Sequence, residues 1–481
     1  MSAPVVNPTD PLADLLQEGV VEVAVLEEVL GRALQGGGDF AEVFIEDRAS
    51  TAVHLDDTRI EELTSGRLRG AGIRVLSGDA TGFAHTADLS PAGLLEAAAA
   101  AASAARGGGA DTKVIALSNR AGTPQLVMIA PESVAKERKV ELLHIADAAA
   151  RGRGDAIKQV SATYADSRRR ILVANSDGVL ATDGRVRTRF MVQCVAVGDT
   201  GMQTGTDAPG HTQGFEFFDA INPELVATTA ADRALTLLRA RPAPTGKLPV
   251  VLRRGAGGVL FHEACGHGLE SDLVGRDASV FRGSVDQMVA SPLVTVVDDG
   301  TYELGWGTSA IDDEGTPVAR NVLIENGVLT DYMWDLTRAR KNGRASSGNG
   351  RRETYQDLPM VRMTNTYLVA GDSDPDDIIA DTEYGLYCAA LGGGQVNTAT
   401  GDYVFGVTEA YLIENGEITD PVRAAQLIGN GLDTLRLVDA VGNDFDTWAG
   451  TCGKDGQGVP VSAGQPTLRV SELTVGGTAR G

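Results

Sequence analysis

The chain has 481 residues, of which 43% are hydrophobic and 22% are charged, a composition typical of globular proteins. A net charge of −23 argues against nucleic-acid binding, which needs a basic surface. The amino terminus lacks the basic and apolar regions of a secretory signal, and the longest apolar run, near residues 94–105, is too short to span a bilayer. Four cysteines without paired short spacings favour a cytoplasmic protein over a disulfide framework.

The first predicted unit, residues 1–115, is an α+β lobe. A helix is expected over 21–34, and Ser90 followed by Pro91 predicts the start of a second helix. Short apolar runs between these helices predict antiparallel strands over 40–46, 51–55, 70–75 and 81–84.

The second predicted unit, residues 116–240, repeats this α+β order. Helices are expected over 134–151 and 223–238, and strands over 157–166, 169–174 and 186–196. A proline-containing stretch near 239–248 predicts a boundary, and the third unit, 241–481, is expected to be mostly β and to carry a metal-binding helix.

Two similar stretches of the third unit, 323–331 and 412–420, each contain an Asn-Gly pair between alternating apolar residues. An Asn-Gly pair predicts a type I′ turn, because both of its central positions need positive φ. We expect two similar hairpins to build one sheet. Either an internal duplication or two independent uses of the same turn explains the similarity.

The third unit also contains His262, Glu263 and His267, so two of the six histidines lie within six residues. A hydrolytic zinc site needs imidazole ligands, a general base and an open position for water. Residues five apart lie roughly 140° apart around a regular helix. Both rings therefore reach one ion only if the helix widens by one residue, as in a π-bulge, or ends near Gly266. A helix with one buried and one exposed histidine is the alternative without a metal.

A catalytic zinc needs a third protein ligand. Cys452 lies in a glycine-rich stretch, 449–457, where loop exposure and the nearby Lys454 favour a thiolate; chemistry alone leaves its role as a ligand open. Cys265, inside the histidine motif, is a candidate ligand, a small core residue, or the nucleophile of a cysteine hydrolase. A zinc that only staples the helix to a loop would instead give a non-catalytic partner subunit or regulatory scaffold.

A glycine-rich segment is a candidate for substrate binding. Gly392, Gly393 and Gly394, with Gln395, precede a β run that reaches residue 405. Glycines let another backbone come close, so a peptide can add here as an extra strand that is recognised through its main chain. A loop that needs positive φ is the alternative.

Charged side chains mark two further candidates. Arg351 and Arg352 follow a glycine-rich, flexible loop, and their guanidiniums are suited to a substrate carboxylate or a partner chain. The carboxylates of Asp312, Asp313 and Glu314 can bind a cation or a substrate amine, although a solvated turn is the more common explanation of such a cluster.

Taken together, these segments resemble the TldD/PmbA family, on the side of its TldD subunits, over essentially the whole chain. The most specific marks are His-Glu-Ala-Cys-Gly-His at 262–267, Asp-Asp-Glu-Gly at 312–315, Leu-Ile-Glu-Asn-Gly at 323–327, Gly-Asn-Gly-Arg-Arg-Glu at 348–353, Met-Thr-Asn-Thr at 363–366, Gly-Gly-Gly-Gln-Val at 392–396 and Cys-Gly-Lys-Asp-Gly-Gln at 452–457.

The resemblance implies a cytoplasmic, zinc-dependent metalloprotease. It implies that His262, His267 and Cys452 bind Zn²⁺ and that Glu263 is the catalytic base. It also implies pairing with a PmbA (TldE)-like subunit that lacks the metal motif, around a chamber that admits unfolded peptides, with roles in peptide maturation or turnover. The sequence leaves a homodimer open.

Overall fold

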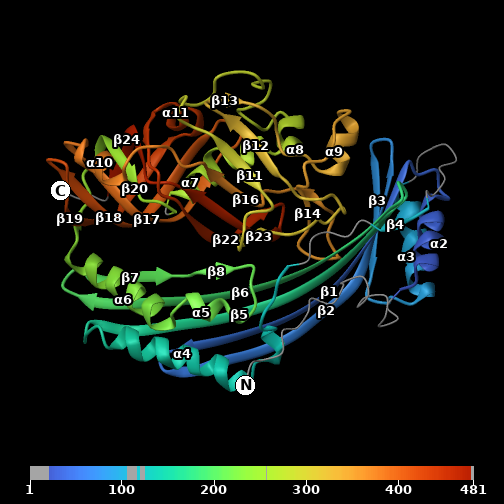
Figure 1. The fold of residues 1–481 in the computed structure, drawn as a ribbon, viewed down its shortest axis with the longest axis horizontal. Helices are drawn as coiled ribbons and strands as arrows, with labels where there is room; N and C mark the ends of the chain where they lie inside the picture. Colours follow the sequence, from blue (N-terminus) through green and yellow to red (C-terminus); the bar gives the residue numbers. More distant parts are fainter. Residues whose placement is uncertain (1–20, 106–115, 120–124, 256, 478–481) are drawn as a thin grey trace.

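The residues that the structure describes are 21–105, 116–119, 125–255 and 257–477 of a computed structural model (Figure 1). A long curved sheet with helices at both of its ends lies against a mostly β C-terminal domain, so the expected α+β class is confirmed. The predicted boundary between residues 115 and 116 adjoins residues outside the described part. None of the described helices is long and apolar enough to cross a bilayer.

One sheet runs through both predicted N-terminal units. Its strand order is β3-β2-β1-β5-β6-β4, and β7 and β8 also pair with β6. The strands are β1 (Phe40–Asp56), β2 (Arg59–Ser77), β3 (Ala80–Thr86), β4 (Ser118–Asn119), β5 (Ile157–Asn175), β6 (Val179–Gly198), β7 (Gly201–Asp207) and β8 (Gly210–His211). Because β1 pairs antiparallel with β5, the two units share their central strands.

The predictions of separate strands over 40–46 and 51–55, and over 157–166 and 169–174, are wrong, because each pair is one continuous strand. The apolar pattern of β1 breaks at Asp47, which lies opposite Arg170 of β5. The Arg170 guanidinium donates to the Asp47 carboxylate at 2.7 Å. The two charges therefore compensate each other across the ladder, and the strands continue through the polar positions.

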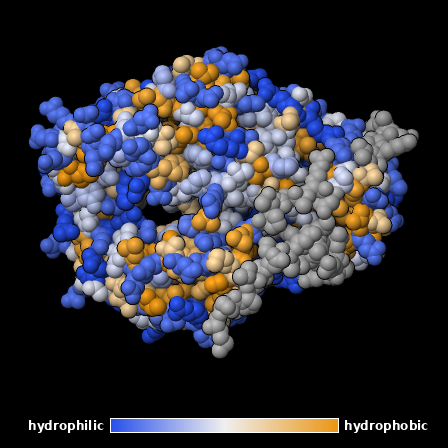
Figure 2. All heavy atoms as spheres, viewed as in Figure 1, coloured by the Kyte–Doolittle hydropathy of each residue, from blue (hydrophilic) through white to orange (hydrophobic). Residues whose placement is uncertain are grey.

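Two groups of helices cover the two ends of this sheet (Figure 1). At one end lie α2 (Val23–Leu34) and α3 (Pro91–Ala104), and at the other α4 (Lys136–Arg151), α5 (Phe217–Ala220) and α6 (Pro223–Arg239). The predicted cap is present, since the Ser90 hydroxyl accepts from the Gly93 N–H at 3.2 Å. Figure 2 shows a hollow between the C-terminal domain and the end of the sheet that carries α6.

Strand alternation decides which residues of the sheet meet the C-terminal domain. Val43 of β1 packs into the core under α2 and α3, whereas Phe44 packs against Ile311 of the C-terminal domain. Successive side chains of a strand point to opposite faces, so Glu42 and Glu46 share the face of Phe44. Both carboxylates are fully buried there.

The C-terminal domain contains a closed ring of five strands and a separate six-stranded sheet. The ring runs β17 (Tyr384–Val396), β10 (Gly246–Leu252), β24 (Leu468–Gly477), β20 (Ala425–Asn430), β18 (Asp402–Glu414) and back to β17, with β9 (Arg241–Pro242), β19 (Glu417–Arg423) and β21 (Val438–Val441) at its sides. The second sheet runs β13 (Val328–Leu329), β12 (Arg320–Glu325), β11 (Val296–Asp299), β16 (Asn365–Leu368), β23 (Gln457–Gln465) and β22 (Asp446–Lys454). The smaller elements are α7 (Gly258–Phe261), α8 (Ser271–Gly275), α9 (Leu336–Lys341), α10 (Pro375–Ala380), α11 (Gly431–Arg436), and the pair β14 (Gly350–Arg351) and β15 (Met360–Val361).

Both Asn-Gly pairs form the predicted tight turns. Asn326 and Gly327 have φ values of 48° and 85°, and Asn415 and Gly416 have 56° and 76°. The expectation of a single sheet is wrong, because β12–β13 belongs to the six-stranded sheet and β18–β19 to the ring. Turn chemistry fixes a hairpin locally, but the partners of its outer strands are chosen by the rest of the fold.

Candidate metal centre

The histidine motif lies where a regular helix changes its geometry. After α7 the chain forms a π-helix, η2 (His262–Gly266), and then a 3₁₀ turn, η3 (His267–Leu269). The His267 N–H donates to the His262 carbonyl, five residues earlier. Of the two local distortions that the spacing allowed, the structure has the widened helix.

The widened turn brings both imidazoles to one side of the helix. The ring centroids of His262 and His267 lie 5.1 Å apart, with the rings nearly perpendicular at 83°. Both side chains are buried. Gly266 packs against Met363, because a Cβ there would lie 2.2 Å from the methionine sulfur and would displace that side chain. The helix with one exposed histidine is therefore ruled out.

Cys452 reaches the same point from a distant strand. Its Sγ lies 3.3 Å from His267 Nε2. Ligand atoms of His262, His267 and Cys452 all lie within 4.8 Å of one another, and all three residues are buried. The structure thus brings together the three residues that the family resemblance implied as ligands.

The surroundings of Cys452 differ from the predicted exposed loop. The cysteine is 4% exposed, in a hairpin of β22 and β23 whose turn is formed by Asp455 and Gly456. Burial disfavours a thiolate, but the neighbouring His262 and His267 outweigh it and lower the pKa of Cys452 to about 4. The imidazoles, rather than a lysine in an exposed loop, make this cysteine a thiolate.

Two glutamates flank His267 in different ways. Glu263 Oε2 lies 3.8 Å from His267 Nε2, and the Glu263 side chain is 25% exposed, so it borders both the ligand cluster and solvent. Glu270 is fully buried, and its Oε2 lies 3.0 Å from His267 Nδ1. Burial opposes the Glu270 anion, but His267 and Lys454 outweigh it and lower the pKa of Glu270 to about 2.

Sequence reasoning missed Glu270 and Asp272, which surround the Lys454 ammonium. Glu270 lies three residues after His267, a spacing that places both side chains on one face of a helical turn. That spacing was a usable signal for Glu270. The sequence carried no such signal for Asp272, because its partner Lys454 is distant in the sequence.

The three converging groups fit a metal ion. His262 Nδ1 is buried and has no hydrogen-bond partner among the described residues. Two imidazole nitrogens and a thiolate are a ligand set that zinc accepts, and three protein ligands leave a position open. A buried polar nitrogen without a partner is costly, and a bound metal ion is a partner that would satisfy it.

Cys265 does not join this cluster. Its thiol donates to the Phe261 carbonyl at 3.0 Å, and burial raises the pKa of Cys265 to about 12. A thiol that stays protonated in a core is a poor nucleophile. The structure therefore gives Cys265 a packing role and offers no support for a cysteine hydrolase.

The segment Gly392–Gln395 lies in β17, which contacts the π-helix. Gly392, Gly393 and Gly394 all have φ outside the left-handed region, so a positive-φ loop does not explain these glycines. Gly394 is needed for close packing, since a Cβ there would lie 2.1 Å from the ring of Phe405, whereas a Cβ on Gly393 would meet open space. The pairing of β17 with β10 ends at Cys388, before the glycines.

The predicted arginine loop is a buried segment. The Arg351 guanidinium donates to the Met363 and Pro460 carbonyls. Arg352 is fully buried and donates to the Glu42 carboxylate and the Asp313 carbonyl. The interpretation of a flexible loop with guanidiniums available to a ligand is wrong, because the chain's own acceptors bind both guanidiniums.

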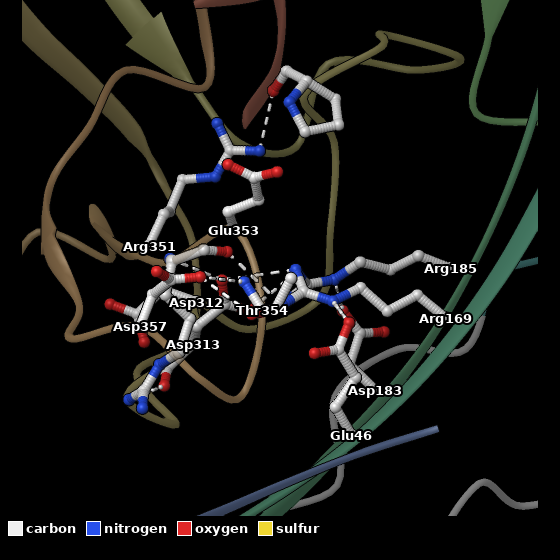
Figure 3. Close-up of polar contacts among 12 residues, drawn as sticks. Glu46, Arg169, Asp183, Arg185, Asp312, Asp313, Arg351, Glu353, Thr354 and Asp357 are labelled. Atoms are coloured by element: carbon white, nitrogen blue, oxygen red, sulfur yellow. Dashed lines mark hydrogen bonds and ion pairs between the residues drawn. The ribbon is translucent and has the colours of Figure 1, made fainter. Parts of the chain in front are cut away.

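The acidic residues before this segment are also buried, so the interpretation of a solvated turn is wrong. Figure 3 shows Arg169 and Arg185 reaching from the long strands toward the turn that carries Asp313. Their guanidiniums lie 3.4 and 2.9 Å from the Asp313 carboxylate, and they hold the pKa of Asp313 below its usual range against the effect of burial. Glu314 pairs with Arg74 at 2.8 Å. These carboxylates join the N-terminal sheet to the C-terminal domain.

Comparison with known proteins agrees with this arrangement. Three family models match: the PmbA/TldA metallopeptidase domain 1 over residues 41–105, the central domain over 129–238 and the C-terminal domain over 245–477. A protein of Haemophilus influenzae named "Metalloprotease TldD homolog" is 41% identical over 449 residues, which cover 92% of this chain and 93% of the relative. A Saccharolobus solfataricus protein named "Zinc metalloprotease TldD homolog" is 27% identical and covers 71% of this chain and 76% of its own.

Solved structures share the fold. The crystal structure of TldE from Thermococcus kodakarensis superposes with a TM-score of 0.77 at 18% identity, covering 94% of this chain and 100% of that chain. Such low identity shows only the common fold. The domain matches and the 41% identical relative confirm the resemblance seen in the sequence: this chain belongs to the PmbA/TldD family of metallopeptidases.

Proposed function

We propose that the chain is a zinc-dependent peptidase that hydrolyses peptide bonds of unfolded peptides or small proteins, in peptide maturation or turnover. The observation that carries the proposal is the convergence of His262, His267 and Cys452, with ligand atoms within 4.8 Å of one another, beside the partly exposed Glu263. A bound zinc ion supplies Lewis acidity at this point. The name of the Saccharolobus relative supports zinc as the metal.

Glu263 is the proposed general base. Its carboxylate lies 3.8 Å from His267 Nε2, so it borders the ligand cluster, and its 25% exposure lets water and substrate reach it. In peptide hydrolysis such a carboxylate takes a proton from the attacking water and passes it to the leaving amine. Glu270 does not fill this role, because it is fully buried and faces His267 Nδ1 and Lys454.

The alternative is a zinc-stapled subunit without catalysis. A structural zinc site is closed by four protein ligands. In the described part of the chain, the cluster contains His262, His267 and Cys452 and no fourth residue. This three-ligand set and the exposure of Glu263 favour catalysis over a staple.

The proposed peptide site is the edge of β17 at Gly392, Gly393, Gly394 and Gln395. On one side Gly394 and Gln395 pair with β18, next to an irregularity at Gly392 and Gly393, while the pairing of β17 with β10 on the other side has already ended at Cys388. An unpaired edge offers main-chain donors and acceptors to an extended peptide, which suits unfolded substrates of varied sequence. Arg351 and Arg352 have no part in this site, because their guanidiniums are buried against the chain's own acceptors.

We further propose that the chain works in the cytoplasm, either as a homodimer or with a PmbA/TldE-like subunit. The TldE structure with the same fold supports a subunit of matching architecture. The four cysteines are free and buried, as expected for a reducing compartment.

The test is to purify the chain, alone and together with a PmbA-like subunit, and to measure bound metal and hydrolysis of an unfolded peptide on the same samples. We expect zinc in the preparation, loss of hydrolysis after chelation, and recovery when zinc is added back. Hydrolysis that survives complete removal of the metal would overturn the proposal. Full zinc occupancy with no hydrolysis in either assembly would instead establish the zinc-stapled scaffold.

A further inference from the structure

The ligands of the metal centre come from two segments that are far apart in the sequence. Cys452 and His267 are 185 positions apart, yet their ligand atoms lie 3.3 Å apart. Metal affinity depends on how well such a ligand set is held in place before the ion binds. The contacts that fix the two segments relative to each other are therefore part of the site.

Lys454 makes a direct connection between these segments. It follows Cys452 by two positions on β22, so both side chains leave the same face of the strand. Its ammonium lies 2.9 Å from Glu270 Oε2, 2.8 Å from Asp272 Oδ1 and 3.0 Å from the Val361 carbonyl. These acceptors use all three N–H donors of the ammonium. The Lys454 side chain is only 7% exposed.

Glu270 continues the connection to the histidine. A single oxygen of Glu270, Oε2, faces both the Lys454 ammonium at 2.9 Å and His267 Nδ1 at 3.0 Å. Since Nδ1 is turned to the carboxylate, Nε2 is the nitrogen that faces Cys452, at 3.3 Å from its sulfur. A carboxylate that holds the second ring nitrogen fixes both the orientation and the tautomer of a metal-binding imidazole.

We propose that Lys454 and Glu270 are positioning residues that assemble the metal centre, Lys454 by tying the hairpin of Cys452 to the helical segment of His262 and His267, and Glu270 by orienting the His267 ring. This inference rests on the zinc site proposed above. In the sequence, Lys454 was of interest only as a cation near Cys452. In the structure its ammonium instead binds Glu270 and Asp272, which follow His267.

The physical basis is the charge balance of the buried cluster. Without the Lys454 ammonium, the carboxylates of Glu270 and Asp272 are left buried without their shared cation, and the structure must rearrange or hydrate to relieve them. Either response moves Glu270, and with it the His267 ring, away from Cys452. Loss of an outer partner of a metal ligand typically weakens metal binding by about 10- to 100-fold.

The experiment measures zinc affinity of the full chain by competition with a chelator, for the unmodified protein and for Lys454→Met. Methionine keeps most of the length of the side chain and removes its charge. We expect Lys454→Met to bind zinc about 10- to 100-fold more weakly. Asp272→Asn keeps an oxygen toward Lys454 and should weaken binding by a smaller factor, so it provides a second reading if Lys454→Met does not fold.

The matched control is Lys139→Met. Lys139 is likewise buried, 2% exposed, and its ammonium lies 2.6 Å from the Asp166 carboxylate in the N-terminal half. Its loss removes a comparable buried ion pair far from the ligands in the sequence. Lys139→Met should lower thermal stability but keep the zinc affinity of the unmodified chain.

A spectroscopic measurement separates positioning from general stabilisation. With cobalt(II) in place of zinc, the thiolate of Cys452 gives a charge-transfer absorption that reports the sulfur–metal contact. We expect this absorption, per bound cobalt, to be weaker or shifted in Lys454→Met, unchanged in Lys139→Met, and partly restored in Lys454→Arg. A residue that only stabilises the fold would not alter the spectrum of the loaded protein.

The outcomes distinguish this inference from the proposed function. If the unmodified chain binds zinc and cleaves peptide, and Lys454→Met keeps both its affinity and its cobalt spectrum, the positioning role is wrong and the peptidase stands. If the unmodified chain binds no zinc, both proposals are wrong. Equal loss of zinc affinity in Lys454→Met and Lys139→Met would also overturn the positioning role, because it would reflect stability alone.

Discussion

The metal centre and the ionic cluster around Asp313 are both buried and polar, but their polar groups are arranged differently. In the ionic cluster, cations face anions, as where Arg169 and Arg185 surround the Asp313 carboxylate. In the metal centre, ligand atoms of two histidines and a cysteine converge to within 4.8 Å of one another, and His262 Nδ1 has no hydrogen-bond partner among the described residues. Buried polar groups that compensate one another hold a structure together, whereas two imidazoles and a thiol that converge form a ligand set that a metal ion can occupy.

A sequence motif alone does not tell whether charged residues bind a ligand or one another. Asp312, Asp313 and Glu314 were candidates for binding a cation or a substrate amine, and Arg351 and Arg352 were candidates for binding a substrate carboxylate or a partner chain. In the fold the chain's own groups bind them: Asp313 and Glu314 meet arginines, the two arginines meet carbonyls or a carboxylate, and Asp312 accepts from backbone N–H groups. The following predictions test whether the two clusters have the separate roles that this contrast assigns to them.

The largest expected effect is the loss of the metal in His262→Ala. This change removes one of three ligands and leaves two, which hold a catalytic zinc poorly. Elemental analysis of the purified variant should find little zinc, and peptide hydrolysis should be abolished. Full zinc occupancy in this variant would exclude His262 as a ligand. Cys265→Ala is the control, and it should keep the metal, because the Cys265 thiol bonds only to the Phe261 carbonyl in the described structure.

Glu263→Ala should keep zinc and lose hydrolysis. The carboxylate borders the ligand cluster at 3.8 Å from His267 Nε2 but is not one of the converging ligands. Removal of a general base typically costs about 10²- to 10⁴-fold in rate. Metal content and hydrolysis rate measured on the same sample check this, and turnover at the unmodified rate would refute the assignment of the base.

Arg352→Met tests the ionic cluster, and the expected change is in stability. Arg352 is fully buried against Glu42 across the interface, and breaking one partner of such a pair costs about 3–5 kcal/mol. Denaturant unfolding should show this loss, while zinc content stays that of the unmodified chain. The control is Arg153→Met, whose pair with Asp232 is nearly half exposed, at 46% and 47%, and should contribute about 0–1 kcal/mol. Loss of zinc in a folded Arg352→Met would show that the two clusters are not separate.

The smallest expected effect is on how the stability of the fold depends on pH. Burial raises the pKa of Glu314 above its usual 4.5; Arg74 opposes the shift, and the nearby carboxylates of Asp335, Asp312 and Glu42 add to it. A carboxyl whose pKa is higher in the folded state stabilises the fold at low pH, and this stabilisation is lost as the pH rises above 4.5.

Glu314→Gln removes this titration. The variant should therefore gain stability relative to the unmodified chain between pH 5 and pH 8, by on the order of 1 kcal/mol per unit of pKa shift. Unfolding free energies of both proteins at the two pH values check the sign. Glu325→Gln, at an exposed position, should show no such difference. A relative loss of stability at pH 8 would contradict the raised pKa of Glu314.

Local chemistry was readable from the sequence. The spacing of His262 and His267 restricted the helix to two distortions, one of which is present, because backbone geometry alone decides which side chains can share a face. The cap at Ser90 and the turn at Asn326 were predicted for the same reason: their hydrogen bonds and φ values depend on a few neighbouring residues.

The sequence by itself thus determined the α+β class, the turns and the two imidazoles. The fold decided that Cys452 comes within reach of His267, that Lys454 faces Glu270 rather than the thiol, and that Arg352 is buried. It did so because these contacts join strands and helices that are far apart in the chain, and strand pairing and domain packing, not neighbouring residues, set their partners. The local sequence around a charged residue in a glycine-rich stretch is the same whether its side chain faces water, a metal or another charge in the folded protein.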